Sequence, residues 1–299
     1  MAPPFLSKTR TELSSFDLRQ YLATLRTSVD QRLKDLLPPA GQPDPLSLNE
    51  AMSYAVLAGG KRIRPCLTIA ICEALGGKPE LALDSACALE FVHSYSLVHD
   101  DLPAMDDDEL RRGQPTCHIK YGQATAILVG DALLTLAFEV LANSTRPGRP
   151  QLHLSIVELA KAAGARGMVG GQAIDMAIKD KAGLKLDALE QCHRLKTAAL
   201  FSAAATLGAL AAGATEEKIA SASKYGMDLG LAFQHADDLR DEEFIELREQ
   251  ALARTHELCN NAIQSAQALG DRSDALISLC HLVIERAIEG ADEVPTKDR

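Results

Sequence analysis

Apolar residues recur along most of this chain at the spacing of one helical face. In the segment 16–37, for example, leucine and valine side chains fall three or four positions apart. Similar patterns predict helices, with ends uncertain by about three residues, at 47–58, 65–75, 79–102, 123–143, 151–179, 187–212, 215–241, 243–269 and 272–289. No segment shows the convincing alternation of a strand. We therefore predict an all-α fold.

Proline, glycine and a capping pattern mark the ends of the first predicted helices. The stretch Pro38–Pro45 ends the first helix, and Ser47 with Glu50 forms a capping box that opens the second. Pairs of glycines end the next two helices. The sequence contains no repeat of fixed period and no long linker. We predict one domain spanning residues 1–299, built from long helices, with 1–15 as a flexible N-terminus.

Composition and charge exclude several classes of partner. The 299 residues carry a net charge of -10, which argues against binding to nucleic acid or to anionic lipid. The seven cysteines are odd in number and form no C-x-x-C pair, so we expect reduced thiols and a cytoplasmic protein. The segment Met1–Arg10 has no long apolar region, and no apolar run reaches the ~18 residues of a membrane span. We predict no membrane span.

Five carboxylates follow directly after the end of an apolar helix. They are Asp100, Asp101, Asp106, Asp107 and Asp108. Their mutual repulsion is unfavourable unless cations neutralise it or some of them stay protonated. A charge run is more often a solvated face, so this cluster alone would not establish a functional site.

A second acidic cluster strengthens the case for a metal site. Asp237, Asp238 and Asp241 follow another apolar helical pattern, and Asp237 lies one helical turn from Asp241, separated by ~6 Å of rise. Oxygen ligands alone suit Mg²⁺, which commonly binds one or two carboxylates together with substrate phosphates. We therefore predict bound Mg²⁺ at the two clusters.

Basic residues at three places in the sequence could bind phosphate. Arg111 and Arg112 follow the first cluster, where glycine and proline predict a turn. Lys61 and Arg64 lie at a predicted helix start, where backbone N–H groups also favour an anion. Lys196 lies within an apolar helix, where a lysine that extends to the surface is the simpler interpretation. Together they provide contacts to diphosphate in an acidic protein.

The order of these motifs resembles that of the trans-prenyltransferase family, specifically the bacterial farnesyl diphosphate synthase type. The resemblance runs from about residue 46 to residue 241. Its elements are Gly59–Pro65, His93–Asp101, Asp106–Gly113, Gly170–Gln172 with Asp175, Lys196–Thr197, and Phe233–Gln234 with the second cluster. Each element is modest alone, but their joint presence in this order is specific. The resemblance implies an isoprenoid-synthase-type bundle around a central cavity.

The resemblance also implies an activity. The chain would join isopentenyl diphosphate head to tail with dimethylallyl or geranyl diphosphate and release diphosphate, with Mg²⁺ at three positions. We expect a short product, farnesyl diphosphate first; geranyl or geranylgeranyl diphosphate are the alternatives. A homodimer is expected by family habit and by the frequency of two-fold assemblies.

The resemblance implies a role for each matching residue. The metal ligands would be Asp100, Asp106 and Asp237, assisted by Asp101, Asp238 and Asp241. The allylic diphosphate would contact Arg111, Lys196, Thr197 and Gln234, and the isopentenyl diphosphate would contact Lys61, Arg64, His93 and Arg112. The catalytic set would be Asp100, Asp101, Asp106, Arg111, Lys196 and Asp237, and product length would depend on Tyr95 and Ser96.

Helical geometry supports part of this assignment. His93 precedes Asp100 by seven residues, so both lie along one face of a helix about 10 Å apart; a core histidine is the other interpretation. Ser96 lies more nearly below Asp100, whereas Tyr95 lies on the flank of the helix. The choice of Tyr95 as the residue that limits the product therefore depends on the resemblance.

The sequence departs from the family after Asp241. The family has a lysine-bearing loop there, whereas this chain continues into the helical pattern 242–247, and His235 and Arg240 stand where apolar residues are expected. Either the cover of the active site is lacking or the sequence omits a mobile loop. The competing hypotheses are a weakly active or regulatory prenyltransferase-like subunit, a terpene cyclase or head-to-head synthase, and a helical binding protein without catalysis.

Overall fold

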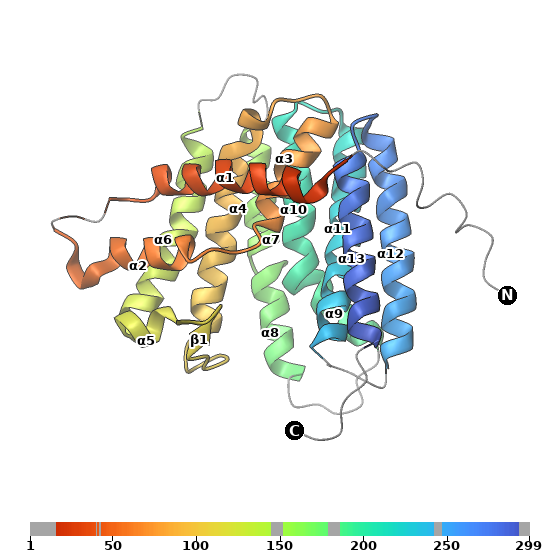
Figure 1. Ribbon diagram of the computed structural model, residues 1–299. Coiled ribbons are helices and arrows are strands. Elements are labelled where there is room, and N and C mark those ends of the chain that lie inside the picture. Colours follow the sequence, from red (N-terminus) through yellow and green to blue (C-terminus); the bar gives the residue numbers. More distant parts are fainter. Residues whose placement is uncertain are drawn as a thin grey trace.

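The structure, a computed structural model, describes residues 16–39, 41, 43–144, 152–178, 186–241 and 247–292. These residues form a bundle of helices with one short hairpin (Figure 1), which confirms the predicted all-α fold. The helices are α1 (Leu18–Leu36), α2 (Leu48–Leu57), α3 (Ile63–Ala74), α4 (Pro79–Asp100), α5 (Cys117–Tyr121), α6 (Gln123–Ala142), α7 (Leu152–Ala163), α8 (Met168–Ile178), α9 (Leu186–His193), α10 (Ala199–Ala211), α11 (Glu216–Arg240), α12 (Arg248–Leu269) and α13 (Asp274–Asp292).

The centre of the bundle is helix α10. Every residue of this helix after Ala199 is buried, and most of them are alanine or leucine. It packs against α3, α4, α7 and α11. Such a helix has no polar face, so it is stable only when other helices surround it. Helix α4 lies beside it and ends at the first acidic cluster.

Two glycines let α11 approach α10 closely. A Cβ at Gly226 would lie 2.4 Å from the carbonyl oxygen of Phe201, and one at Gly230 would lie 2.7 Å from the Cα of Ala198. Neither position has room for a side chain. This close packing fixes α11, and with it the second acidic cluster, against the turn that carries Lys196.

The predicted capping box at the start of α2 is wrong. Ser47 has a left-handed backbone with φ of 53°, and its side chain makes no capping hydrogen bond. The carboxylate of Asp44 accepts hydrogen bonds from the backbone N–H groups of Asn49 and Glu50 instead. A carboxylate can satisfy these donors from outside the helix, so the serine is not needed as a cap.

Two of the long predicted helices are interrupted. The helix predicted at 151–179 is two helices, α7 and α8, because the chain turns between Gly164 and Gly167; a Cβ at Gly167 would lie 2.1 Å from the carbonyl oxygen of Ala162. The helix predicted at 187–212 contains a π-helical turn at Arg194–Ala198 between α9 and α10. Such turns are frequent at functional sites.

A short hairpin follows the first acidic cluster, although we predicted no strand. Strands β1 (Leu110–Arg111) and β2 (Gln114–Pro115) pair antiparallel, so that Arg111 faces Gln114. The turn residues Arg112 and Gly113 both have positive φ, which a two-residue hairpin turn of type I′ requires. Two-residue strands are too short to show a period in the sequence.

Helix α6 bears on the prediction that no segment spans a membrane. Among the described residues, it is the one helix long and apolar enough to cross a membrane by length and composition. This is weak evidence for a span, because the core helix of a globular bundle passes the same test. The helix packs along α4 in the bundle.

The predicted flexible N-terminus and the segment 242–246 lie outside the described residues.

Candidate active site

A cavity of about 630 Å³ lies between α4, α6, α8, the π-helical turn and α11. Its polar lining residues are Arg64, His93, Ser96, His99, Asp100, Gln172, Lys196, Thr197 and Gln234. Its apolar or aromatic lining residues are Tyr95, Leu97, Leu102, Ala104, Met105, Ile127, Met168, Val169, Ala173, Met176 and Leu200. A mostly apolar cavity with a few polar groups is typical of a small-molecule site, and the volume is within the usual range.

Asp100 is the predicted metal ligand that lines this cavity. It is the last residue of α4, and the backbone N–H of Asp106 donates to its carbonyl oxygen at 2.9 Å. Burial raises the pKa of Asp100 to about 6; Lys196 and Arg111 oppose the shift, whereas Asp106 and Asp101 add to it. Crowded carboxylates of this kind favour a bound cation.

Lys196 reaches the cavity from the π-helical turn. Its Nζ lies 2.5 Å from the carboxylate of Asp175 on α8. Burial alone would lower the pKa of Lys196, but the hydrogen bond to Asp175 and the charges of Asp175, Asp100 and Asp106 raise it. The ammonium group is therefore charged at neutral pH. Gly171 makes the approach possible, because a Cβ there would lie 2.1 Å from the backbone nitrogen of Lys196.

Thr197 and Gln234 form one wall of the cavity together. The hydroxyl of Thr197 donates to Oε1 of Gln234 at 2.7 Å, and Nε2 of Gln234 donates to the carboxylate of Asp238 at 2.7 Å. The amide of Gln234 is therefore held from both sides. This arrangement brings the two predicted contacts of the allylic diphosphate together.

Arg111 is held by carboxylates of its own cluster. It lies 2.5 Å from Asp101, which is only 3% exposed, and 3.3 Å from Asp108. Burial alone would lower the pKa of Arg111, but the hydrogen bond and charge of Asp101 raise it. The structure thus places Asp101 as the partner of Arg111.

The residues predicted to contact the isopentenyl diphosphate come from several elements. Arg64 and His93 line the cavity, and the guanidinium of Arg64 lies 4.7 Å from the centroid of the Phe201 ring. Burial lowers the pKa of Arg64 to about 10. Burial, with the positive charges of Arg64 and Arg112, keeps the pKa of His93 well below its usual value. His93 is therefore a neutral imidazole.

Arg112 and Lys61 lie away from this cavity. Arg112 donates to the carbonyl oxygen of Gly59, and it lines a smaller cavity with Asp101 and Arg111. Lys61 lines a separate cavity of about 250 Å³ that also contains Arg286. Burial and then the charge of Arg286 lower the pKa of Lys61. The five predicted contacts to diphosphate in the 59–112 region therefore do not all meet at one surface.

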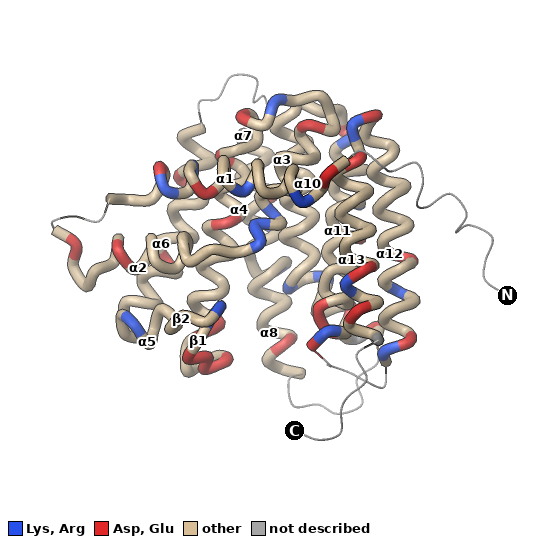
Figure 2. Tube along the Cα trace, viewed as in Figure 1, with Lys and Arg blue, Asp and Glu red and all other residues tan. Residues whose placement is uncertain are grey.

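The three carboxylates of the second acidic cluster have different surroundings. Asp237 forms an ion pair with Arg286 of α13 at 2.7 Å. The carboxylate of Asp238 is 7% exposed, accepts from Gln234 and lies 3.4 Å from Nε2 of His193. Asp241 is exposed beside Arg240 at 3.5 Å. Figure 2 shows acidic residues at the same end of the bundle, around β1, the end of α8 and the lower ends of α11 and α13.

The oxygen ligands fit Mg²⁺ best at the first cluster. Asp100 and Asp106 offer carboxylate oxygens, which are the ligands that Mg²⁺ prefers, and the charges of both carboxylates act on Lys196. Asp237 would have to exchange its ion pair with Arg286 for an ion. The assignments of Asp100, Asp106, Asp237 and their assisting carboxylates remain predictions.

Both predicted chain-length residues line the cavity. Tyr95 is 6% exposed, and its ring packs edge-to-face on that of His99, with centroids 5.8 Å apart. Ser96 donates to the carbonyl oxygen of His93. Both residues therefore lie on the cavity side of α4.

Several residues near the site have no signal in the sequence. Arg286 comes from α13, 49 residues after its partner, and no local pattern predicts that pairing. Arg62 belongs to the Gly59–Pro65 motif but is buried in an ion pair with Glu90 at 2.5 Å, and it also contacts Asp30. His193 was not predicted to lie near the site. It lies beside His235, the residue that stands where the family has an apolar side chain.

The sequence is similar to that of known prenyl diphosphate synthases. The family model described as polyprenyl synthetase matches residues 45–244. The chain is 45% identical over 245 residues to geranylgeranyl pyrophosphate synthase 12, chloroplastic, of Arabidopsis thaliana, which covers 81% of this chain and 67% of that protein. It is 44% identical to the chloroplastic geranylgeranyl pyrophosphate synthase of Catharanthus roseus, over 76% of this chain and 63% of that protein. The chain thus spans about two thirds or less of these curated relatives.

Solved structures match over nearly their full length. The FPP/GFPP synthase of Zymomonas mobilis superposes with a TM-score of 0.82 at 38% identity, covering 89% of this chain and 98% of that chain. The geranyltransferase of Legionella pneumophila gives a TM-score of 0.83 at 34% identity, over 91% and 98% of the two chains. Sequence and fold therefore agree, and the chain belongs to the polyprenyl synthetase family of prenyltransferases.

Proposed function

We propose that this chain condenses isopentenyl diphosphate head to tail with an allylic diphosphate and releases diphosphate. The observation that supports this most is a single cavity that joins Asp100 and Lys196 to a long apolar wall. An isoprenoid diphosphate has the same two halves, an anionic head and an apolar chain. Family membership supports the same reaction.

The residues of the chain would divide the work as follows. Asp100, Asp106 and Asp237 would hold Mg²⁺, which when bound stabilises the negative charge on the departing diphosphate. Lys196 and Thr197, which line the same cavity as Asp100, would contact the same anion. The apolar wall would exclude water while the allylic cation exists, so that the isopentenyl double bond attacks it. The proton lost in forming the new double bond would pass to the released diphosphate.

The names of the relatives bear on the identity of the product. We expected farnesyl diphosphate, but several curated relatives are named geranylgeranyl pyrophosphate synthases. These names support the alternative better, although the Zymomonas structure is named an FPP/GFPP synthase. We therefore propose geranylgeranyl diphosphate as the product.

Product analysis tests this proposal. The purified chain should be incubated with Mg²⁺, isopentenyl diphosphate and, in turn, dimethylallyl, geranyl or farnesyl diphosphate. Conversion of all three to geranylgeranyl diphosphate is the expected result. Accumulation of farnesyl diphosphate, with farnesyl diphosphate itself unused, would support our first expectation instead. A folded protein that makes no product would support a regulatory subunit.

We also propose a homodimer that buries the apolar faces of α6 and α7. Ile127 and Leu128 on α6 are 47% and 43% exposed, and Leu154 and Val157 on the adjacent α7 are 40% and 45% exposed. Exposed apolar side chains of this size on two helices in contact favour burial against a second surface. Light scattering should give twice the mass of the chain, and a monomer at micromolar concentration would contradict the proposal.

A further inference from the structure

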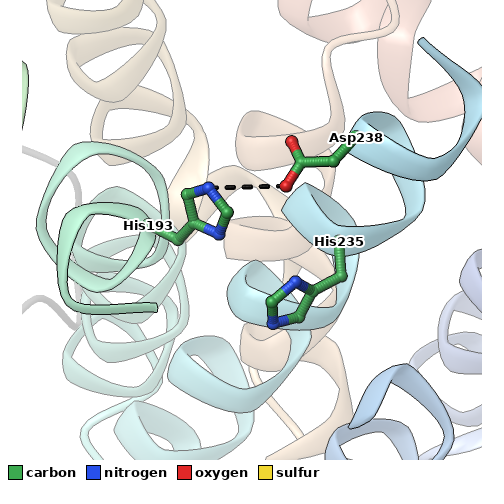
Figure 3. A group of neighbouring side chains, drawn as sticks. All are labelled: His193, His235 and Asp238. Carbon is green, nitrogen blue, oxygen red and sulfur yellow. Dashed lines mark ion pairs between the residues drawn. The ribbon is translucent and has the colours of Figure 1, made fainter. Parts of the chain in front are cut away.

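Three buried side chains converge below the wall of the cavity. They are His193 at the end of α9, and His235 and Asp238 on α11 (Figure 3). They are only 8%, 1% and 7% exposed. Each offers one ligand atom, and these three atoms all lie within 4.8 Å of one another.

We propose that His193, His235 and Asp238 form a binding site for Zn²⁺ or a similar divalent transition metal. Two imidazole nitrogens and one carboxylate oxygen are ligands that zinc prefers, whereas Mg²⁺ prefers oxygen alone. The site shares Asp238 with the second acidic cluster, and it assigns this residue a role other than the assisting magnesium ligand that we first predicted.

The spacing of the three residues suits one ion. His235 and Asp238 are three positions apart on α11, so their side chains emerge on the same helical face. His193 approaches from α9, and its Nε2 lies 3.4 Å from the carboxylate of Asp238. Ligand bonds of about 2.0–2.2 Å in a tetrahedron place ligand atoms about 3.4 Å apart, so this pair needs little movement.

The outer contacts of His235 resemble those of a metal ligand. Its Nε2 lies 3.3 Å from Oε1 of Glu190, and Arg254 holds that carboxylate through contacts of 2.7 and 3.4 Å. A histidine that binds a metal commonly donates its other ring N–H to a carboxylate, which orients the ring. Glu190 would do this for His235 and leave Nδ1 for the ion.

His193 has a coordinating atom that the protein does not use. Its Nδ1 is buried and has no hydrogen-bond partner, although Nε2 lies beside Asp238. A buried polar atom without a partner costs free energy. Rotation of this ring about its side-chain bonds would exchange the two nitrogens, so that either one could bind an ion.

The surroundings leave room for an ion and little else. A cavity of about 10 Å³ adjoins the three ligands and is otherwise lined by Leu186, Leu189, Leu239, Leu247 and Ala251. This volume is close to the minimum that one water molecule needs, about 10–15 Å³. The site could therefore complete its coordination with a single water, but it could not admit an organic ligand.

The site is connected to the large cavity through Gln234. Asp238 accepts from Nε2 of Gln234, whose Oε1 accepts from Thr197. A bound ion would hold Asp238 and thereby the orientation of both wall residues. We assign the ion a structural and positioning role, because none of its three ligands lines the large cavity.

Metal binding by the full chain tests the proposal without any assay of turnover. The chain is first stripped with a chelator and then dialysed against Zn²⁺ in excess Mg²⁺, which competes for sites that have oxygen ligands only. We expect one Zn²⁺ per chain in the wild type. The His193→Ala and His235→Ala variants should each lose it. Asp100→Ala and His281→Ala are matched controls and should keep it.

Two further measurements keep the result interpretable. Circular dichroism should show that the variants are folded, and Zn²⁺ should raise the thermal midpoint of the wild type but not that of His193→Gln. Co²⁺ in place of Zn²⁺ should give the spectrum of nitrogen and oxygen ligands, without thiolate bands from the seven cysteines.

Two outcomes would overturn the proposal. One is a wild-type chain that retains no Zn²⁺ in excess Mg²⁺, and the other is a folded double variant of His193 and His235 that retains as much as the wild type. The cluster would then be a hydrogen-bonded polar core only. Neither outcome bears on the proposed condensation, which is measured separately.

Discussion

The residue that limits product length is the most informative target for mutation. Tyr95 lines the large cavity on the same helix as Asp100, and it is 6% exposed. Its change to alanine removes about seven heavy atoms, whereas one isoprene unit adds about five carbon atoms. The space that is freed therefore suits about one more unit, and we expect the main product of Tyr95→Ala to be longer by five carbons or more.

The same change has a cost in stability. Truncation of a buried aromatic side chain typically costs about 3–5 kcal/mol of unfolding free energy. Tyr95 already borders a cavity on one side and contacts the ring of His99 on the other, so we expect about 3 kcal/mol. Thermal or urea denaturation measures this cost and shows whether the variant remains folded.

The assay is chromatography of the products from wild type, Tyr95→Ala and Ser96→Ala. Ser96 also lines the cavity, but its substitution removes a single oxygen atom, so that variant should keep the wild-type product. The reasoning fails if Tyr95→Ala is folded and active and yet yields the wild-type chain length. A longer product from Ser96→Ala alone would move the limiting position to Ser96.

Three further predictions concern the metals, the core and pH. Asp237→Ala should lower turnover by orders of magnitude with the helical circular dichroism unchanged, and activity near that of the wild type would contradict its role as a ligand. Arg62→Met would leave Glu90 buried without its ion-pair partner and should cost roughly 3–5 kcal/mol in urea denaturation; a loss under 1 kcal/mol would argue against that pair. Burial, and then the charge of His235, lowers the pKa of His193 from 6.5 to about 4. Between these two pH values the unfolded chain binds more protons than the folded chain, so the free energy of unfolding falls as the pH falls through this range. In metal-free protein, His193→Gln should reduce that fall in unfolding free energy by about 3 kcal/mol, measured by urea denaturation at several pH values. A variant with the pH dependence of the wild type would refute this prediction.

The helices could be predicted from the sequence because their apolar faces are long and periodic. The turn at Gly164–Gly167 was missed, since a short break leaves the apolar period on both sides nearly intact. The capping box at Ser47 failed for another reason. Its pattern is local, whereas the hydrogen bonds come from Asp44, outside the pattern.

Site residues on one helix could be placed from the sequence, whereas contacts between distant helices could not. Asp100, Tyr95 and Ser96 share α4 and all line the cavity. Helical spacing was sufficient to place Ser96 near Asp100, whereas Tyr95 was assigned through the family resemblance. Lys61 was expected to bind the same diphosphate as Arg64, but it precedes α3, and the left-handed backbone of Arg62 turns the chain between the two residues. The ion pair of Asp237 with α13 depends on how distant helices pack, and single-sequence patterns contain no information about that.

The burial of Asp238 has a simple geometric cause. Successive residues of a helix are rotated by about 100°, so Asp237 and Asp238 cannot face the same surface. One turn earlier, His235 lies on the same side as Asp238, which is why the unusual histidine and the buried carboxylate meet. The departure from the family pattern at His235 was visible in the sequence, but its partner on α9 was not.

Metal-dependent incorporation of labelled isopentenyl diphosphate tests the central claim most directly. The purified wild-type chain is given geranyl diphosphate and Mg²⁺, with Asp100→Ala and a chelator-treated sample in parallel. We predict labelled prenyl diphosphate in the first sample and a loss of orders of magnitude in the other two. Label incorporated at the wild-type rate in the presence of chelator, or none at all by folded protein with Mg²⁺, would contradict the proposed reaction.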